Sequence, residues 1–175
     1  MEIKAQLNKP YTEKEKENFI VIYNHKIGYE IKETDEALEA WGYTTEELLE
    51  QAKEAKYNEA STLAKEYLEG GNALYEFEEG KHIEATDGNI AKMTAYALAF
   101  VTGQLQPTDT VLWNTKEDET VELTQTQIVQ IIEGLGGVQA MVWAVKFPQY
   151  VALIKEAQTI EEVNYIEINY EAEEK

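Results

Sequence analysis

The chain has 175 residues, a formal net charge of -19 at pH 7 and no arginine, so its basic side chains are lysines and two histidines. A surface of this sign repels phosphate groups, so the composition argues against binding to nucleic acids and to anionic membranes. The absence of cysteine excludes disulfides, thiolate metal sites and thiol nucleophiles. An apolar fraction of 43% is typical of folded proteins, so we expect the acidity to lie on the surface of a globular chain.

The N-terminal residues lack the basic and apolar segments of a secretion signal, and the longest apolar run, AMVWAV, is far shorter than a bilayer span. We therefore expect a soluble protein that is made in the cytoplasm and has no membrane partner.

Residues 1–71 are predicted to form a mainly helical region after one short strand, EIKAQL, whose apolar residues alternate. Thr12 and Glu15 have capping-box spacing, which predicts a helix near 13–26 that Gly28 can end. A short helix is expected over 36–41, within DEALEAW, ending at Gly42.

A second capping box, Thr44 with Glu47, predicts a long helix that ends at Gly70 and Gly71. Its apolar stripe is thin, so it either packs lightly on its own domain or lies along a partner. That stripe consists of Leu48, Ala52, Ala55, Leu63 and Tyr67.

Residues 72–175 are predicted to form an α+β domain that contains two strand-turn-strand-helix units. The first is ALYEFEEGKHIEAT with a helix that ends at Gly103, and the second is VLWNTKEDETVELT with a helix that ends at GLGG. Aligning Thr86 with Thr124 superimposes the two units without a gap, so we propose an internal repeat of 73–103 and 111–137, with chance similarity as the alternative. The alignment pairs Tyr75 with Trp113, Gly80 with Asp118, Ile83 with Val121, Ala85 with Leu123, and Ile90 with Ile128.

The second unit has a third capping box, Thr124 with Gln127, and Leu123 can staple the start of that helix. Trp113 and Val121 are expected to face the core. The acidic residues of KEDE, 116–119, are then the solvated turn of a hairpin.

The C-terminal part is predicted to hold a buried helix around Trp143, because VQAMVWAVKFPQYVALIKEA is apolar nearly all round. Pro148 should kink or split this helix near residue 145. Thr159 can cap one short turn, and YIEINY, 165–170, alternates as a final strand. The fold class is therefore α+β: a small antiparallel sheet from the two units, a helical N-terminal region and a buried C-terminal helix.

A catalytic, cofactor or metal site is not predicted. The histidines, His25 and His82, have no ligand spacing, and Ser61 lies inside a helix. The glycine-rich segments follow helices and are interpreted as helix stops. The acidic turn places Lys116 at an expected ligand position of a calcium loop, so weak surface binding of a divalent ion is the alternative to a plain turn.

Several runs resemble an uncharacterised domain family of short bacteriophage and prophage tail proteins, often encoded beside tail-fibre genes. The runs are YEFEEGKHIEATDGNIAKMTAYA, LWNTKEDETVELT and VWAVKFPQYVALIKEAQTIEEVNYI, within 72–168; the late segment ALIKEAQTIEE departs slightly from the family pattern. The resemblance implies a fold and a tail context, and it brings no catalytic residues. The matching positions are Tyr75, Phe77, Gly80, Trp113, Asp118, Val121, Leu123 and Thr124.

Our first hypothesis is therefore a non-enzymatic, tail-associated protein that is structural or assists tail-fibre assembly. Its partners would be other phage tail or fibre proteins, or further copies of itself, and it would move from the bacterial host cytoplasm to the virion tail. The alternative is an acidic phage-encoded inhibitor of a host defence or nucleic-acid-binding protein, motivated by the charge. An enzyme that uses Glu or Asp with a divalent cation is the weakest hypothesis.

Overall fold

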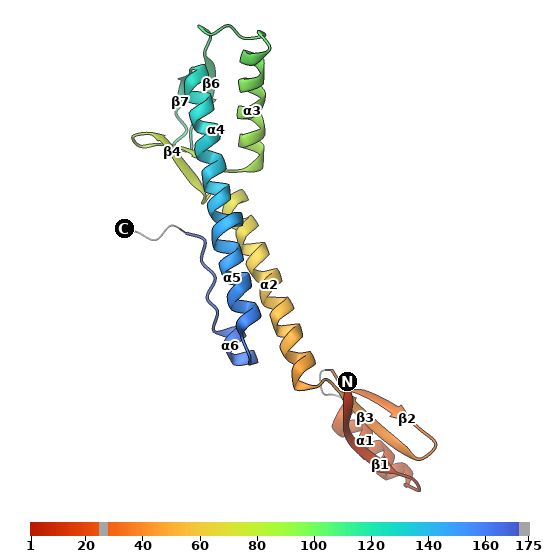
Figure 1. The fold of residues 1–175 in the computed structure, drawn as a ribbon. Helices are drawn as coiled ribbons and strands as arrows, with labels where there is room; N and C mark the ends of the chain where they lie inside the picture. The colour runs from red at the N-terminus through yellow and green to blue at the C-terminus, as the bar shows by residue number, and fades with distance from the viewer. Residues whose placement is uncertain (25–27, 172–175) are drawn as a thin grey trace. The chain divides into compact units, whose positions relative to one another are not determined.

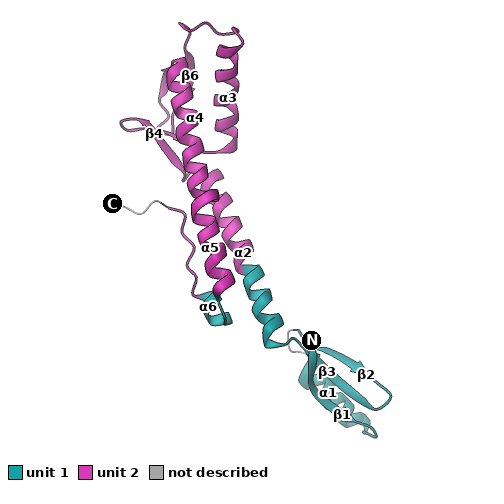
Figure 2. Cartoon of the chain, viewed as in Figure 1, with its two compact units in different colours: residues 1–55, 157–164 teal, residues 56–156, 165–175 magenta. Residues whose placement is uncertain are grey.

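The computed structural model describes residues 1–24 and 28–171 of the chain (Figure 1). Contacts divide the chain into two compact units (Figure 2). Unit 1 comprises residues 1–55 and 157–164, unit 2 comprises 56–156 and 165–175, and the boundary falls within the long helix α2. Helices and small antiparallel sheets alternate along the chain, so the predicted α+β class is confirmed.

Unit 1 contains a three-stranded antiparallel sheet in the order β1 (Glu2–Asn8), β3 (Ala37–Gly42), β2 (Glu30–Glu33). Helix α1 (Glu13–Asn24) packs its buried Phe19 with Leu38 and Ala40 of the central strand. The capping box of α1 is confirmed, since the N–H of Thr12 donates to the Glu15 carboxylate at 2.7 Å and the N–H of Glu15 to Thr12 Oγ1 at 3.3 Å. The predicted end of this helix at 25–26, with His25, lies outside the described residues.

The short helix predicted over 36–41 is wrong, because this segment is the central strand β3. Ala37, Leu38 and Ala40 are at most 2% exposed, and β1 and β2 pair with β3 on either side. Pairing with β1 and β2 gives the backbone groups of β3 hydrogen-bond partners on both edges. The free energy gained from this pairing and from burial outweighs the helix propensity of Ala, Leu and Glu. Strand β2 was not predicted, because its EIKE sequence is mostly charged and lies at a sheet edge.

Helix α2 (Thr45–Glu69) has the predicted capping box, and the chain leaves it through Gly71, whose φ is 77°. Its buried face differs from the predicted stripe, since Leu48 is 41% exposed. The buried residues follow one another at intervals of four, which places them on one side of the helix. They are Ala60, Ala64 and Leu68.

Unit 2 contains two hairpin-helix units in succession. The first consists of β4 (Leu74–Glu78), β5 (Lys81–Glu84) and α3 (Asp87–Val101), and the second of β6 (Val111–Asn114), β7 (Thr120–Leu123) and α4 (Gln125–Ala140). Each hairpin is a separate two-stranded sheet, so the small sheet expected from both units is instead two sheets.

The residues paired by the sequence alignment hold equivalent places in the two units. Tyr75 lies opposite Ile83 on the neighbouring strand, as Trp113 lies opposite Val121. Both turns contain a residue with positive φ at the aligned position, Gly80 at 72° and Asp118 at 60°. Thr86 and Thr124 each accept a hydrogen bond from the backbone of the third residue of the helix that follows.

The helix of the second unit is much longer than predicted. Segments α4, η1 (Met141–Lys146, a π-helix) and α5 (Phe147–Glu156) form one helix of 32 residues. The predicted stop at Gly136 and Gly137 is therefore wrong, and neither glycine has a positive φ. The helix does not split before Pro148. It contains instead the π-helical segment, in which the N–H of Phe147 bonds to the carbonyl of Val142.

The expectation that the C-terminal helix is buried holds for few of its residues. Only 22% of the most apolar stretch of the 32-residue helix is buried. By length and composition alone this is a helix that can cross a membrane, but Ile128 and Ile131 are fully buried in the core of the protein itself. The exposed large residues of the helix are Val129, Met141, Val145 and Leu153.

The predicted final strand over 165–170 is wrong, because this extended segment makes no strand ladder. Side chains of the helices hold it instead: the hydroxyl of Tyr150 donates to the carbonyl of Asn169 at 2.7 Å, and Lys146 Nζ donates to that of Tyr170 at 3.1 Å. Tyr170, 5% exposed, donates its hydroxyl to the carbonyl of Ala60 at 3.1 Å, and burial raises its pKa to about 12. The short helix α6 (Ile160–Asn164) precedes this segment and has the predicted Thr159 cap.

Candidate functional site

The turn of the second hairpin is docked onto the first hairpin. The backbone N–H of Lys116 donates to the carbonyl of His82 in β5 at 2.9 Å, and Lys116 Nζ forms an ion pair with Glu84. The Glu117 carboxylate accepts the N–H of His82 at 3.1 Å and lies 2.8 Å from its ring Nδ1. Residues 116–119 are all exposed, as predicted for the turn of the hairpin. The prediction did not include the second role of Lys116 and Glu117, which join the two hairpins.

Glu117 stays ionised in this position. The backbone N–H of His82, which favours the charged form, lowers the pKa of the carboxyl to about 2. The His82 ring is partly covered, with a side-chain exposure of 31%, and its neighbour in space is this carboxylate rather than a serine or a metal ligand. The pair is thus a joint between hairpins.

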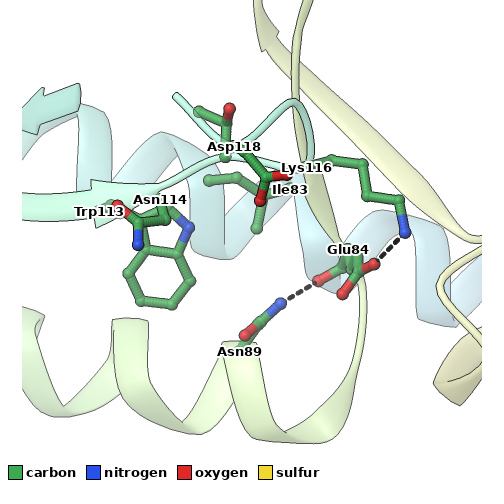
Figure 3. Close-up of a pocket in the computed structure, with 8 residues that line it drawn as sticks. Ile83, Glu84, Asn89, Trp113, Asn114, Lys116 and Asp118 are labelled. Carbon is green, nitrogen blue, oxygen red and sulfur yellow. Dashed lines mark hydrogen bonds and ion pairs between the residues drawn. The ribbon is translucent and has the colours of Figure 1, made fainter. Parts of the chain in front are cut away.

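A pocket of about 370 Å³ lies beside this joint (Figure 3). Its walls come from the end of β5, the first turn of α3, strand β6 and the turn that follows β6. Residues from both hairpin-helix units therefore meet there. The lining residues are Ile83, Glu84, Asn89, Trp113, Asn114, Thr115, Lys116 and Asp118.

Asn89 is held on the α3 side of the pocket by the start of that helix. Its backbone N–H donates to Oγ1 of Thr86, the N-cap, and its side-chain Nδ2 donates to the carbonyl of Glu84, both at 3.1 Å. Two hydrogen bonds from one residue fix both the backbone and the amide plane. The amide oxygen stays available to a ligand.

The turn after β6 is shaped by its own hydrogen bonds. Thr115, 5% exposed, donates its N–H to the carbonyl of Glu119 at 2.8 Å and accepts the N–H of Asp118 at 3.2 Å. Asp118 adopts the left-handed conformation that this turn requires, which aspartate tolerates better than most residues. Asn114 Oδ1 accepts the hydroxyl of Thr120 at 2.8 Å, which orients its Nδ2.

Trp113 forms the aromatic wall of the pocket and is itself fixed by neighbours. Tyr96 of α3 meets its ring edge-on, with ring centroids 6.5 Å apart and planes at 88°. Lys92 Nζ lies 6.0 Å from the ring centroid. The indole is partly buried against the core of unit 2, and Trp113 also lines the pocket.

Within residues 1–24 and 28–171, no three His, Asp or Glu side chains converge as metal ligands. Of the two pocket carboxylates, Glu84 is paired with Lys116. What the pocket offers is a set of hydrogen-bonding groups around an indole.

The structure brings two of the residues singled out in the sequence, Trp113 and Asp118, to this pocket. The others lie elsewhere: Leu123 is fully buried, Thr124 caps α4 and Gly80 forms the free turn of the first hairpin. The remaining four are partly buried and pack against the core of unit 2: Tyr75, Phe77, Val121 and Trp143.

Sequence reasoning missed the other polar residues of the pocket. Asn89, Asn114 and Glu84 come from three different elements, and only the docking of the turn onto β5 brings them together. The internal repeat was a partial indication, because it predicted two hairpins of the same kind in succession, separated by one helix. No local motif indicates that one hairpin binds the other.

Comparison with known proteins adds no relative: no protein-family model, curated protein or solved structure matches this chain. The case for function therefore rests on the residues and geometry of the chain and on the resemblance noted in its sequence.

Proposed function

We propose that this protein is a non-enzymatic, tail-associated protein of a bacteriophage or prophage, which is structural or assists tail-fibre assembly through protein contacts. The resemblance over 72–168 supports the tail context. Several positions that carry it, among them Trp113 and Leu123, are the strand and core positions of the second hairpin.

The observation that carries the proposal is the amount of apolar surface on unit 2. Val101 of α3 is 77% exposed and Leu98 is 59% exposed. On the long helix, Met141 and Leu153 are each 51% exposed. Leu98 and Val101 are three residues apart and are therefore neighbours on the surface of α3. Exposed apolar side chains that adjoin one another in this way are a feature of protein-contact sites.

The same helix borders an apolar groove, which suits a helix or an extended segment of a partner. The groove has a volume of about 500 Å³, and Tyr57 of α2 meets Phe147 of α5 at its edge with ring centroids 5.4 Å apart. Its lining residues are Tyr57, Phe147, Pro148, Val151, Ala152 and Lys155.

The test is to induce or infect the bacterial host, purify the particles and ask by mass spectrometry whether this protein is present or co-purifies with a fibre protein. Val145→Glu places a charge on the exposed apolar face of the helix and should reduce co-purification at least tenfold, since burying an unpaired charge is costly. Thr126→Glu adds the same charge at an exposed polar position in the first turn of that helix, far from Val145, and should have little effect.

A protein that is found neither on particles nor with a fibre protein would contradict the proposal. Salt-sensitive capture of a nucleic-acid-binding host protein instead would favour the acidic inhibitor, because screening weakens attraction between exposed charges.

A further inference from the structure

We propose that the pocket between the two hairpins binds a neutral, polyhydroxylated ligand of the size of one sugar residue. This inference does not depend on the tail function, since it rests on the pocket alone. The volume of about 370 Å³ lies in the range of small-molecule sites, at its lower end.

The hydrogen-bonding groups that face the pocket are a mixture of donors and acceptors. Asn89 uses its Nδ2 within the protein and leaves Oδ1 as an acceptor, whereas Asn114 uses Oδ1 and leaves Nδ2 as a donor. Asp118 adds two acceptor oxygens, for which no donor is found in the described part of the chain. A hydroxyl group both donates and accepts, so several hydroxyls on one ring satisfy such a mixed set.

The amides of Asn89 and Asn114 and the backbone of Asp118 are held in place before any ligand arrives. Asn89 is fixed by the start of α3, Asn114 by Thr120, and Asp118 by a turn that is docked on β5 through the N–H of Lys116. Side chains that are already oriented lose less conformational entropy when a ligand binds. This smaller entropy loss raises the affinity for a neutral ligand that otherwise binds weakly.

The indole of Trp113 supplies the apolar surface that a sugar ring needs. One face of a pyranose presents C–H groups, and an aromatic face packs against such groups while the edge of the sugar keeps its hydroxyls free for hydrogen bonds. In Figure 3, Trp113 and its neighbour Asn114 on β6 lie on one side of the pocket, with Asp118 above and Asn89 below.

The charges around the pocket favour a neutral ligand. An anion would meet the carboxylates of Glu84 and Asp118 in a chain of net charge -19. A cation over the indole would meet Lys92, whose Nζ already lies 6.0 Å from the ring centroid, and Lys116 neutralises one of the two carboxylates. Neither sign of charge is therefore favoured.

The experiment titrates the full-length protein with glucose, galactose, mannose and N-acetylglucosamine and follows the indole N–H signals by ¹H–¹⁵N NMR. The chain has three tryptophans, and the spectrum of Trp113→Phe assigns the relevant signal. We expect a saturable shift of the Trp113 signal with at least one sugar, with a Kd of about 1 mM, and no shift of the other two indole signals. Choline and inorganic phosphate serve as the cationic and anionic probes, and we expect neither to shift it.

Variants at Asp118 separate binding from folding. Asp118→Gly keeps the positive φ, as Gly80 does in the first hairpin, but removes the carboxylate, and should weaken sugar binding about tenfold. Asp118→Asn keeps an acceptor and tolerates the same conformation, so it should retain most of the affinity. Glu79→Ala removes an equal charge from the exposed turn of the first hairpin and should change nothing.

The proposal is overturned if no sugar shifts the Trp113 signal, if choline or phosphate shifts it more strongly than any sugar, or if Asp118→Gly binds as tightly as the unchanged protein. Each result can be read without particles or fibre proteins, so failure here is distinguishable from failure of the proposed tail function.

Discussion

The two hairpin-helix units of unit 2 share one pattern of strands, turns and caps, and they differ in what the turn and the helix contact. The turn at Gly80 is free, since a Cβ added there would meet nothing within 4 Å. The turn at Asp118 is docked on β5 and borders the pocket. Helix α3 ends after 15 residues, whereas α4 continues into a helix of 32 residues. A local pattern thus specifies the hairpin and the cap, and tertiary contacts decide the rest.

The strongest way to break the comparison is Leu123→Ala, which gives the second unit the residue of its counterpart, Ala85. Leu123 is fully buried, so the change leaves a cavity, and we expect a loss of about 3 kcal/mol in the free energy of unfolding. Urea denaturation followed by circular dichroism measures it. Leu112→Ala makes the same chemical change at a residue that is 65% exposed and should cost far less; equal losses would contradict the assignment of the core.

A second test concerns the glycines of α4. A Cβ at Gly134 would lie 2.2 Å from ring atoms of Tyr75, whereas Gly137 has nothing within 4 Å of such a Cβ. We expect Gly137→Ala to stabilise the protein by up to about 1 kcal/mol through helix propensity. Gly134→Ala should destabilise it by about 1–2 kcal/mol, because displacing the ring outweighs the same gain. Thermal unfolding of both variants decides, and two stabilised proteins would rule out the close approach of β4 to α4.

The two turns offer a smaller, purely local test. Gly80→Ala forces an alanine into a conformation with φ near 72° and should cost about 1 kcal/mol without any steric contact. Asp118→Gly relieves the same strain in the second turn and should raise the free energy of unfolding by a few tenths of a kcal/mol. This gain is smaller than the loss expected from Gly80→Ala in the first turn. Paired denaturation curves test the signs. A destabilised Asp118→Gly would show that its carboxylate has a structural role.

The smallest expected effect concerns the pH dependence of stability. The pKa of Glu117 is about 2 in the folded protein, against a usual value near 4.5. Its contribution is therefore present above pH 4.5 and is lost as the pH falls from 4.5 towards 2. We expect Glu117→Gln to lower the urea midpoint at pH 7. Between pH 5 and pH 3 the midpoint of the variant should decrease less than that of the unchanged protein.

Glu79→Gln is the matched change in the first turn, whose side chain is exposed, and it should leave the pH profile as it is. An unchanged profile in Glu117→Gln would mean that the carboxylate does not stabilise the docked turn.

The elements that local patterns specify were predictable from sequence. The capping boxes at Thr12, Thr44 and Thr124 and the two hairpins are all confirmed, because each depends on residues within a few positions of one another. The strand β3 was missed because its pairing partners lie far along the chain. The 32-residue helix was missed because Gly136 and Gly137 were interpreted as a helix stop, whereas both lie inside the helix without a positive φ.

The candidate site could be predicted only in part, for the same reason. Trp113 and Asp118 stood out within a hairpin, but nothing near them in sequence indicates that Glu84 and Asn89, from the preceding unit, complete the walls. The two units are brought together by the backbone hydrogen bond between Lys116 and His82, which no local sequence pattern indicates.

This hydrogen bond joins two main-chain groups, so ordinary substitutions at either residue leave it in place. It closes a loop that contains all of α3 and the exposed connection over 102–110. Lengthening a flexible loop raises its closure entropy only with the logarithm of its length, by about 0.6 kcal/mol for a doubling. The segment around Pro107 and Thr108 is therefore the place to insert an epitope tag or a fluorophore site while keeping the hairpins joined.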